Sequence, residues 1–96
     1  MSAPHDVRAL VAVYGIGIEI ADLGDWGTAR LIAEYDPDGP AIRVNAREIP
    51  RIDLERAIAH ELYHHREAIG EVPRLRGRDA RERAADAFAA ELLGLP

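Results

Sequence analysis

The sequence has 96 residues, a formal net charge of −5, no cysteine, and twelve basic residues that are all arginine. A chain of this length has room for one domain, so we expect residues 1–96 to form a single domain of modest stability. The absence of cysteine excludes disulfides and thiolate metal sites, so any metal must be held by histidine and carboxylate groups. The negative charge argues against general affinity for phosphates, and we expect no direct binding to nucleic acid.

The amino-terminal segment shows no targeting signal. Residues 1–6 contain no basic region, and the apolar run from Leu10 to Ile18 is short and is not followed by a small-residue cleavage site. No stretch is long and apolar enough to predict a membrane span. We therefore expect a cytoplasmic protein without a membrane partner.

The first half of the chain predicts a helix and then a strand. Apolar residues recur at helical spacing from Asp6 to Tyr14, and Gly15 supplies a stop. Isoleucines then alternate with smaller or polar residues over 16–20, which indicates a half-buried strand that ends in the turn 24–27.

Two further strands are expected before residue 46. Residues 28–35 are interpreted as the hairpin partner of the first strand, and the turn 36–39 precedes a third short strand over 41–45. Three successive strands joined by tight turns predict a small antiparallel meander.

The second half of the chain predicts two helices. The first runs from Asp53, a good N-cap, to Ile69, and Gly70 ends it. Its expected apolar stripe consists of Leu54, Ile58, Leu62, His65 and Ile69. After a linker over 70–78, the second helix runs from a cap at Asp79 to Leu93. Its expected buried face consists of Ala85, Phe88, Ala89 and Leu92.

The segment His60-Glu61-Leu62-Tyr63-His64 matches the H-E-x-x-H pattern within the first of these helices. Histidines four residues apart on an α-helix differ by about 40° around its axis and about 6 Å along it, so both imidazoles can reach one ion. Glu61 flanks that ion and is available as a catalytic base. A random shuffle of this composition gives only about 0.015 such matches. We therefore prefer this interpretation to a helix with two half-exposed histidines and a solvated glutamate.

A catalytic zinc site of this type needs a third protein ligand, usually a carboxylate. The last helix offers Glu82 and Asp86, four residues apart and so on one face, with Glu82 as ligand and Asp86 as acceptor of a histidine ring N–H. The alternative is that Glu82 is the capping-box partner of Asp79 and that Asp86 is solvated. Glu91 is a competing ligand, although it lies late in the helix.

The sequence resembles the ImmA/IrrE-like metallopeptidases, bacterial and phage zincins that act on DNA-binding repressors. The resemblance lies in Gly15-Ile16, in the segments 42–45 and 56–62, and above all in the segment 82–93. It implies that Glu82 is the third ligand of Zn²⁺ and that a repressor-type protein, such as one of the helix-turn-helix class, is the substrate or partner. The chain differs from the family in having Tyr63 where glycine is usual.

Four other features of the sequence have both a functional and a structural interpretation. Tyr63 borders the expected metal face, where its hydroxyl would support an oxyanion or donate a proton, although a rim tyrosine is the simpler interpretation. His65 is expected to be a buried histidine rather than part of the metal site. Trp26 at a hairpin tip is either a partner contact or packed on the sheet. The five arginines between Arg74 and Arg83 are expected to be solvated charges of a connector.

We therefore expect an α+β fold, a minimal zincin core. In it an amino-terminal helix and a three-stranded antiparallel sheet precede the H-E-x-x-H helix and the third-ligand helix, both packed on one face. The expected function is that of a zinc-dependent endopeptidase with His60, His64 and Glu82 as metal ligands and Glu61 as catalytic base. The alternatives are a regulatory binding module that uses zinc only as a staple, and one half of a toxin and antitoxin pair.

Overall fold

The computed structural model describes residues 6–95, which form an α+β fold with three α-helices and one three-stranded sheet. In chain order the elements are α1 (Val7–Val13), β1 (Gly17–Ala21), β2 (Ala33–Asp36), β3 (Ala41–Asn45), α2 (Leu54–Ala68) and α3 (Arg78–Leu93), with short 3₁₀ helices at Gly27–Ala29 and Ala46–Arg51. Residues 1–5, on which the expectation of no targeting signal rests, lie outside the described residues. Within 6–95, each helix is too short or too polar to cross a membrane.

The helix boundaries follow from local capping. The carboxylate of Asp6 accepts from the backbone N–H groups of Arg8 and Ala9, and Asp53 caps α2 in the same way through Arg56 N–H. The predicted cap of α3 at Asp79 is wrong, because the helix begins after Gly77, which has φ +86° and no side chain with which to cap. Asp79 instead lies in the first turn, so the capping-box alternative for Glu82 loses its N-cap.

The sheet is mixed, and the predicted antiparallel meander is wrong. Its strand order is β1-β3-β2, with β1 parallel to β3 and β2 antiparallel to β3. Only the hairpin between β2 and β3 matches the prediction. Four of the five residues of β3 are buried, which is typical of a central strand. β3 accordingly has a neighbouring strand on each edge. Residues 22–32, expected to turn tightly and start a strand, instead form a long connection with one 3₁₀ turn.

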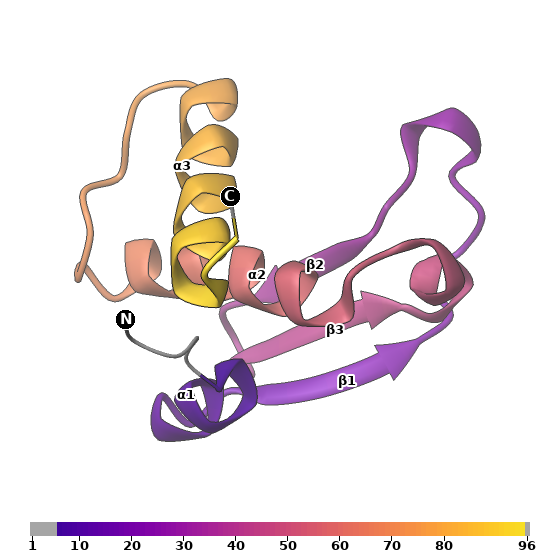
Figure 1. Cartoon of the computed structure of the whole chain (residues 1–96), viewed down its shortest axis with the longest axis horizontal. Coiled ribbons are helices and arrows are strands. Elements are labelled where there is room, and N and C mark those ends of the chain that lie inside the picture. Colours follow the sequence, from indigo (N-terminus) through magenta and orange to yellow (C-terminus); the bar gives the residue numbers. More distant parts are fainter. Residues whose placement is uncertain (1–5, 96) are drawn as a thin grey trace.

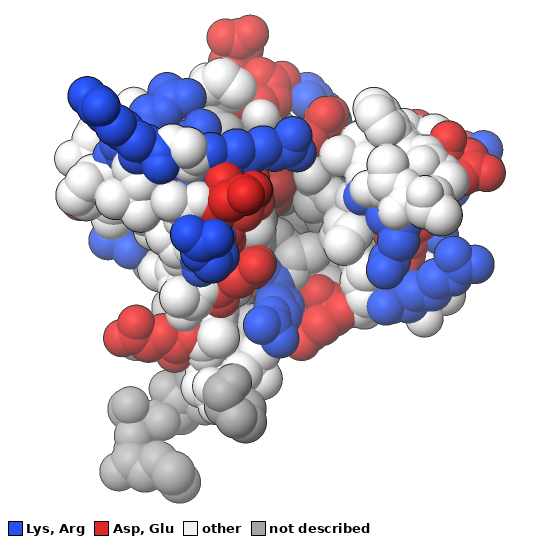
Figure 2. Space-filling model, turned by 90° about the horizontal axis from the view of Figure 1, so that it is seen from above, with Lys and Arg blue, Asp and Glu red and all other residues white. Residues whose placement is uncertain are grey.

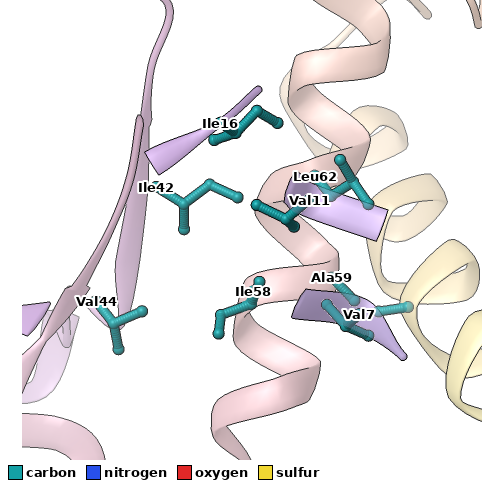
Figure 3. Packing of buried hydrophobic residues seen from close by; sticks show 9 residues of the cluster. Val7, Val11, Ile16, Ile42, Val44, Ile58, Ala59 and Leu62 are labelled. Carbon is teal, nitrogen blue, oxygen red and sulfur yellow. The ribbon is translucent and has the colours of Figure 1, made fainter. Parts of the chain in front are cut away.

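The core lies between the sheet and the helices α1 and α2. Figure 3 shows the side chains of β3 meeting those of the two helices. Ile42 and Val44 come from β3, and the helical members of this cluster include Val7, Val11, Ile58, Ala59 and Leu62. The buried side chains of α2 anchor this helix in the core.

The helix α3 packs mainly on α2 (Figure 1) and contributes Ala89 to the core cluster. Ala85 and Ala89 are its fully buried residues, while Phe88 and Leu92 are partly buried against the core, as predicted. On α2 the predicted stripe ends early, because Ile69 is the C-cap of the helix and is 50% exposed. Contacts between α2 and α3 position the groups described next.

Candidate metal centre

Packing between α2 and α3 positions the predicted metal-binding side chains. Ile58, Ala59 and Leu62 anchor one face of α2 in the core, so His60 and His64 lie on a different face. Ala85 and Ala89 have small side chains and are fully buried, which allows the backbone of α3 to approach α2 closely. Glu82 lies about one turn before Ala85 and therefore reaches the histidines.

Glu82 contacts both imidazoles. Its Oε2 lies 2.7 Å from Nε2 of His60, and its Oε1 lies 3.5 Å from Nε2 of His64. The two rings have their centroids 5.1 Å apart. The same nitrogen of each histidine therefore faces one carboxylate, which is the arrangement that a shared ion between two helices requires.

The other ring nitrogens are held by two further carboxylates. Nδ1 of His60 lies 2.7 Å from Asp86 Oδ1, and Nδ1 of His64 lies 2.7 Å from Glu67 Oε1. An Nδ1–H that donates to a carboxylate leaves the lone pair of Nε2 available to a metal ion and fixes the ring orientation. Asp86 therefore lies where the sequence predicted an acceptor.

Glu67 is a site residue that the sequence analysis missed. Its side chain is 2% exposed, and Arg81 donates to both of its carboxylate oxygens at 3.0 and 3.1 Å. Arg81 and the hydrogen bond from His64 lower the pKa of Glu67, although burial opposes them. The available signal was the spacing of three residues after His64, which places the two side chains on one helix face.

Glu61 is buried and only partly satisfied. It is 7% exposed, and its Oε2 is buried without a hydrogen-bond partner within residues 6–95. Its pKa is raised to about 7, chiefly by burial, with His60 opposing the rise and the charge of Glu82 adding to it. Such a carboxylate takes up a proton near neutral pH, which is the property of a general base.

Tyr63 and His65 do not enter the cluster directly. Tyr63 is 8% exposed and packs on Phe88, with ring centroids 5.7 Å apart, so the expectation of a rim tyrosine is wrong. Its ring lies edge-on to His64 with centroids 6.1 Å apart. His65 is buried as predicted, shares a hydrogen bond of 2.7 Å with the Tyr35 hydroxyl, and has its pKa lowered by burial.

Trp26 and the clustered arginines were also singled out from the sequence. Trp26 is 54% exposed and donates to the carbonyl of Leu23 at 2.9 Å. Of the five arginines, only Arg74 and Arg76 lie in the connection before α3, so the expectation of a connector is wrong for the other three, which lie in α3. All but Arg81 are exposed, and Arg81 binds Glu67.

A cleft of about 520 Å³ opens beside the cluster. One wall is α3 with Arg78, Glu82 and Asp86, and the opposite wall is the segment 30–33 that leads into β2. His60 and Glu61 lie on α2 between the two walls. Figure 2 shows the molecule hollowed between two lobes, with basic side chains on both lobes. The candidate site is therefore accessible to an extended ligand.

The opposite wall is held by one buried amide. Asn45 is 1% exposed, and its Nδ2 donates to the carbonyls of Gly24 and Leu31 at 3.1 and 2.9 Å. Its Oδ1 accepts from the N–H groups of Leu23 and Arg47. The ends of the connection between β1 and β2 are thus joined to the centre of the sheet.

The donor set fits a zinc ion. Zinc prefers imidazole nitrogen and carboxylate oxygen, usually with three protein ligands in catalytic sites. His60, His64 and Glu82 supply that set from two helices, and the ligand atoms of His60, Glu61 and His64 lie within 4.8 Å of one another. Glu82 contacts both imidazoles, so it is a candidate third ligand beside Glu61.

Comparisons with known proteins leave the family open. No family model matches the sequence, and no curated protein sequence matches it. Among solved structures, the chain is similar to the crystal structure of the metallopeptidase zymogen jannalysin of Methanocaldococcus jannaschii. The identity is 18%, the alignment covers 90% of this chain and 85% of that one, and the TM-score is 0.47. A functional inference must therefore come from the side chains of this chain.

Proposed function

We propose that this protein is a zinc-dependent endopeptidase in which His60, His64 and Glu82 hold the metal and Glu61 is the catalytic base. One observation supports this most directly. Nε2 of both histidines faces the Glu82 carboxylate, at 2.7 and 3.5 Å, and the buried carboxylate of Glu61 lines the same cleft with one unpartnered oxygen.

A bound zinc ion would supply Lewis acidity, which polarises a peptide carbonyl and lowers the pKa of a water molecule. Glu61 accepts a proton from the attacking water as the water oxygen bonds to the carbonyl carbon. Glu61 then returns the proton to the leaving nitrogen as the C–N bond breaks, so the carboxylate ends unchanged.

The substrate lies extended along the open edge of β2. β2 is an edge strand, and Ala33 at its start lines the cleft. The carbonyl of Ile32 already accepts from Asn45 N–H at 2.8 Å, so alternation along the antiparallel ladder directs the N–H and C=O of Ala33 away from β3. A peptide backbone in the cleft pairs with these groups.

For the biological substrate we propose a DNA-binding repressor-type protein. This proposal comes from the resemblance of the segment 82–93 to the ImmA/IrrE-like metallopeptidases, and it applies first to DNA-binding proteins encoded beside this chain.

The test combines cleavage with binding on the same purified proteins. The zinc-loaded chain and its Glu61→Gln variant are incubated with each candidate repressor, with Glu91→Gln as an exposed glutamate control on α3. Glutamine keeps the shape of glutamate but cannot accept the proton. We expect Glu61→Gln to retain zinc and lose about 10²-fold or more in turnover.

Two outcomes contradict the proposal. Equal cleavage by the wild type and Glu61→Gln removes Glu61 as the base. If neither protein cleaves but both bind the repressor and release its DNA, the chain is a regulatory binding module that acts by association.

A further inference from the structure

Three arginines in the cleft have no carboxylate partner. Arg51, Arg56 and Arg78 line the cleft and are exposed, and within residues 6–95 no carboxylate oxygen lies within 4.0 Å of their side-chain nitrogens. Arg30, which also lines the cleft, differs because its Nε binds Glu48 at 2.7 Å. In a chain of net charge −5, this is a local excess of free positive charge.

Acidic groups in the same cleft are largely engaged. Asp53 caps α2, and Glu82 and Asp86 contact the two ring nitrogens of His60. Glu61 is buried on α2. The charges that remain free to meet a ligand are therefore the three guanidinium groups.

These arginines flank the candidate metal centre. Arg56 lies four residues before His60 on α2, and Arg78 lies four residues before Glu82 on α3, so each is one helical turn from a proposed ligand and on the same helix face. Arg51 ends the 3₁₀ helix that leads to α2. A peptide that fills the cleft is therefore bordered by all three arginines.

We propose that Arg51, Arg56 and Arg78 make this cleft select peptide segments that carry Asp or Glu side chains next to the scissile bond. The proposal rests on the proposed peptidase function and names its substrate class. Guanidinium groups bind carboxylates through two parallel hydrogen bonds, which gives directional as well as electrostatic preference. Nucleic acid is a weaker fit, because the net charge of −5 on the whole chain opposes a long, continuous phosphate backbone more than it opposes one or two peptide carboxylates.

The test uses three peptide sublibraries that are identical except at two adjacent fixed positions, which carry Glu, Lys or Gln. Cleavage by the zinc-loaded wild type is followed by mass spectrometry. Two ion pairs to exposed arginines are expected to give at most about tenfold preference for Glu over Lys. The preference weakens at high salt because exposed charges are screened.

Charge reversal in the cleft identifies the residues responsible. The double variant Arg56→Glu/Arg78→Glu is expected to lose the preference for Glu or to prefer Lys, and Arg56→Lys/Arg78→Lys to retain most of it. Arg83→Glu is the matched control, since Arg83 is exposed on α3 but does not line the cleft. Equal cleavage of the three sublibraries, or a preference unchanged by Arg56→Glu/Arg78→Glu, overturns the proposal.

A binding arm separates this proposal from the peptidase proposal. Fluorescent peptides from the three sublibraries are titrated into zinc-loaded Glu61→Gln protein, which retains the arginines. If no sublibrary is cleaved but Glu peptides bind about tenfold tighter than Lys peptides, the charge preference stands and the peptidase proposal fails. If a single-stranded oligonucleotide binds tighter than the Glu peptides, the cleft takes nucleic acid and the proposal is wrong.

Discussion

Glu67 lies with its Oε1 2.7 Å from Nδ1 of His64, and its own carboxylate is fixed by Arg81. This contact orients the second histidine of the H-E-x-x-H segment in the way that Asp86 orients the first. The two imidazoles are therefore positioned before any ion binds.

Replacing Glu67 with glutamine is expected to weaken zinc binding by about 10–100-fold without unfolding the protein, because partners of metal ligands typically contribute this much. Zinc affinity is measured by competition with a chromophoric chelator. Glu91→Gln is the control. An unchanged affinity for Glu67→Gln means that His64 does not depend on this contact.

Glu82→Ala is expected to reduce zinc affinity by more than about 100-fold, because it removes one of three proposed protein ligands, whereas Asp86→Asn costs about 10–100-fold. The same competition assay ranks both against Glu91→Ala, which should behave as wild type. If Glu91→Ala loses as much affinity as Glu82→Ala, the ligand on α3 has been misassigned.

Chelation is expected to lower the melting temperature. A ligand that binds only the folded state stabilises it by RT ln(1 + [L]/Kd), about 4 kcal/mol at 1,000 times Kd. Melting is followed by circular dichroism with and without chelator. The Glu82→Ala variant should show little shift. Identical wild-type curves, with zinc loss demonstrated, would show that the metal does not stabilise the contact between α2 and α3.

The pH dependence of the metal-free protein should report the burial of Glu61. Its pKa rises from 4.5 to about 7 on folding, so the folded state favours the protonated form. The free energy of unfolding therefore falls as pH rises from about 4.5 to about 7, by about 3 kcal/mol in total. Glu61→Gln removes this loss. The free energy of unfolding of the variant minus that of the wild type is therefore more positive at pH 8 than at pH 4.

Urea denaturation in the presence of chelator measures this difference at the two pH values, with the exposed Glu91→Gln as control. A difference between Glu61→Gln and wild type that is the same at both pH values contradicts a raised pKa for Glu61.

Local features of the fold were predictable from the sequence, and long-range pairing was not. The capping of α2 by Asp53 and the stop at Gly15 depend on residues within one turn, and the sequence shows them directly. The parallel pairing of β1 with β3 depends on β3 being buried on both faces, and adjacent strands with turn residues between them favour a meander instead.

In the candidate site, too, the features set by local spacing were predictable and those set by tertiary packing were not. The spacing of His60 and His64 is a helix property and needs no tertiary information. Helix spacing offered Glu82 only as one of several possibilities and the resemblance favoured it, because a residue 22 positions after His60 meets it only through α3 packing. The burial of Tyr63 was missed because it depends on packing against Phe88. The guanidinium of Arg66 also covers the Phe88 ring, 5.1 Å from its centroid.

Asn45 has a consequence for how the cleft can be altered. One side chain in β3 fixes the backbone at both ends of the connection between β1 and β2, through Leu23, Gly24 and Leu31. The exposed stretch between them, residues 25–30, is not in the buried core. The sequence and length of residues 25–29 are therefore open to exchange while the ends stay in place, whereas Arg30 is held by its ion pair with the buried Glu48. A loop inserted over 25–29 would extend the rim next to the cleft wall 30–33 without changing the histidines on α2.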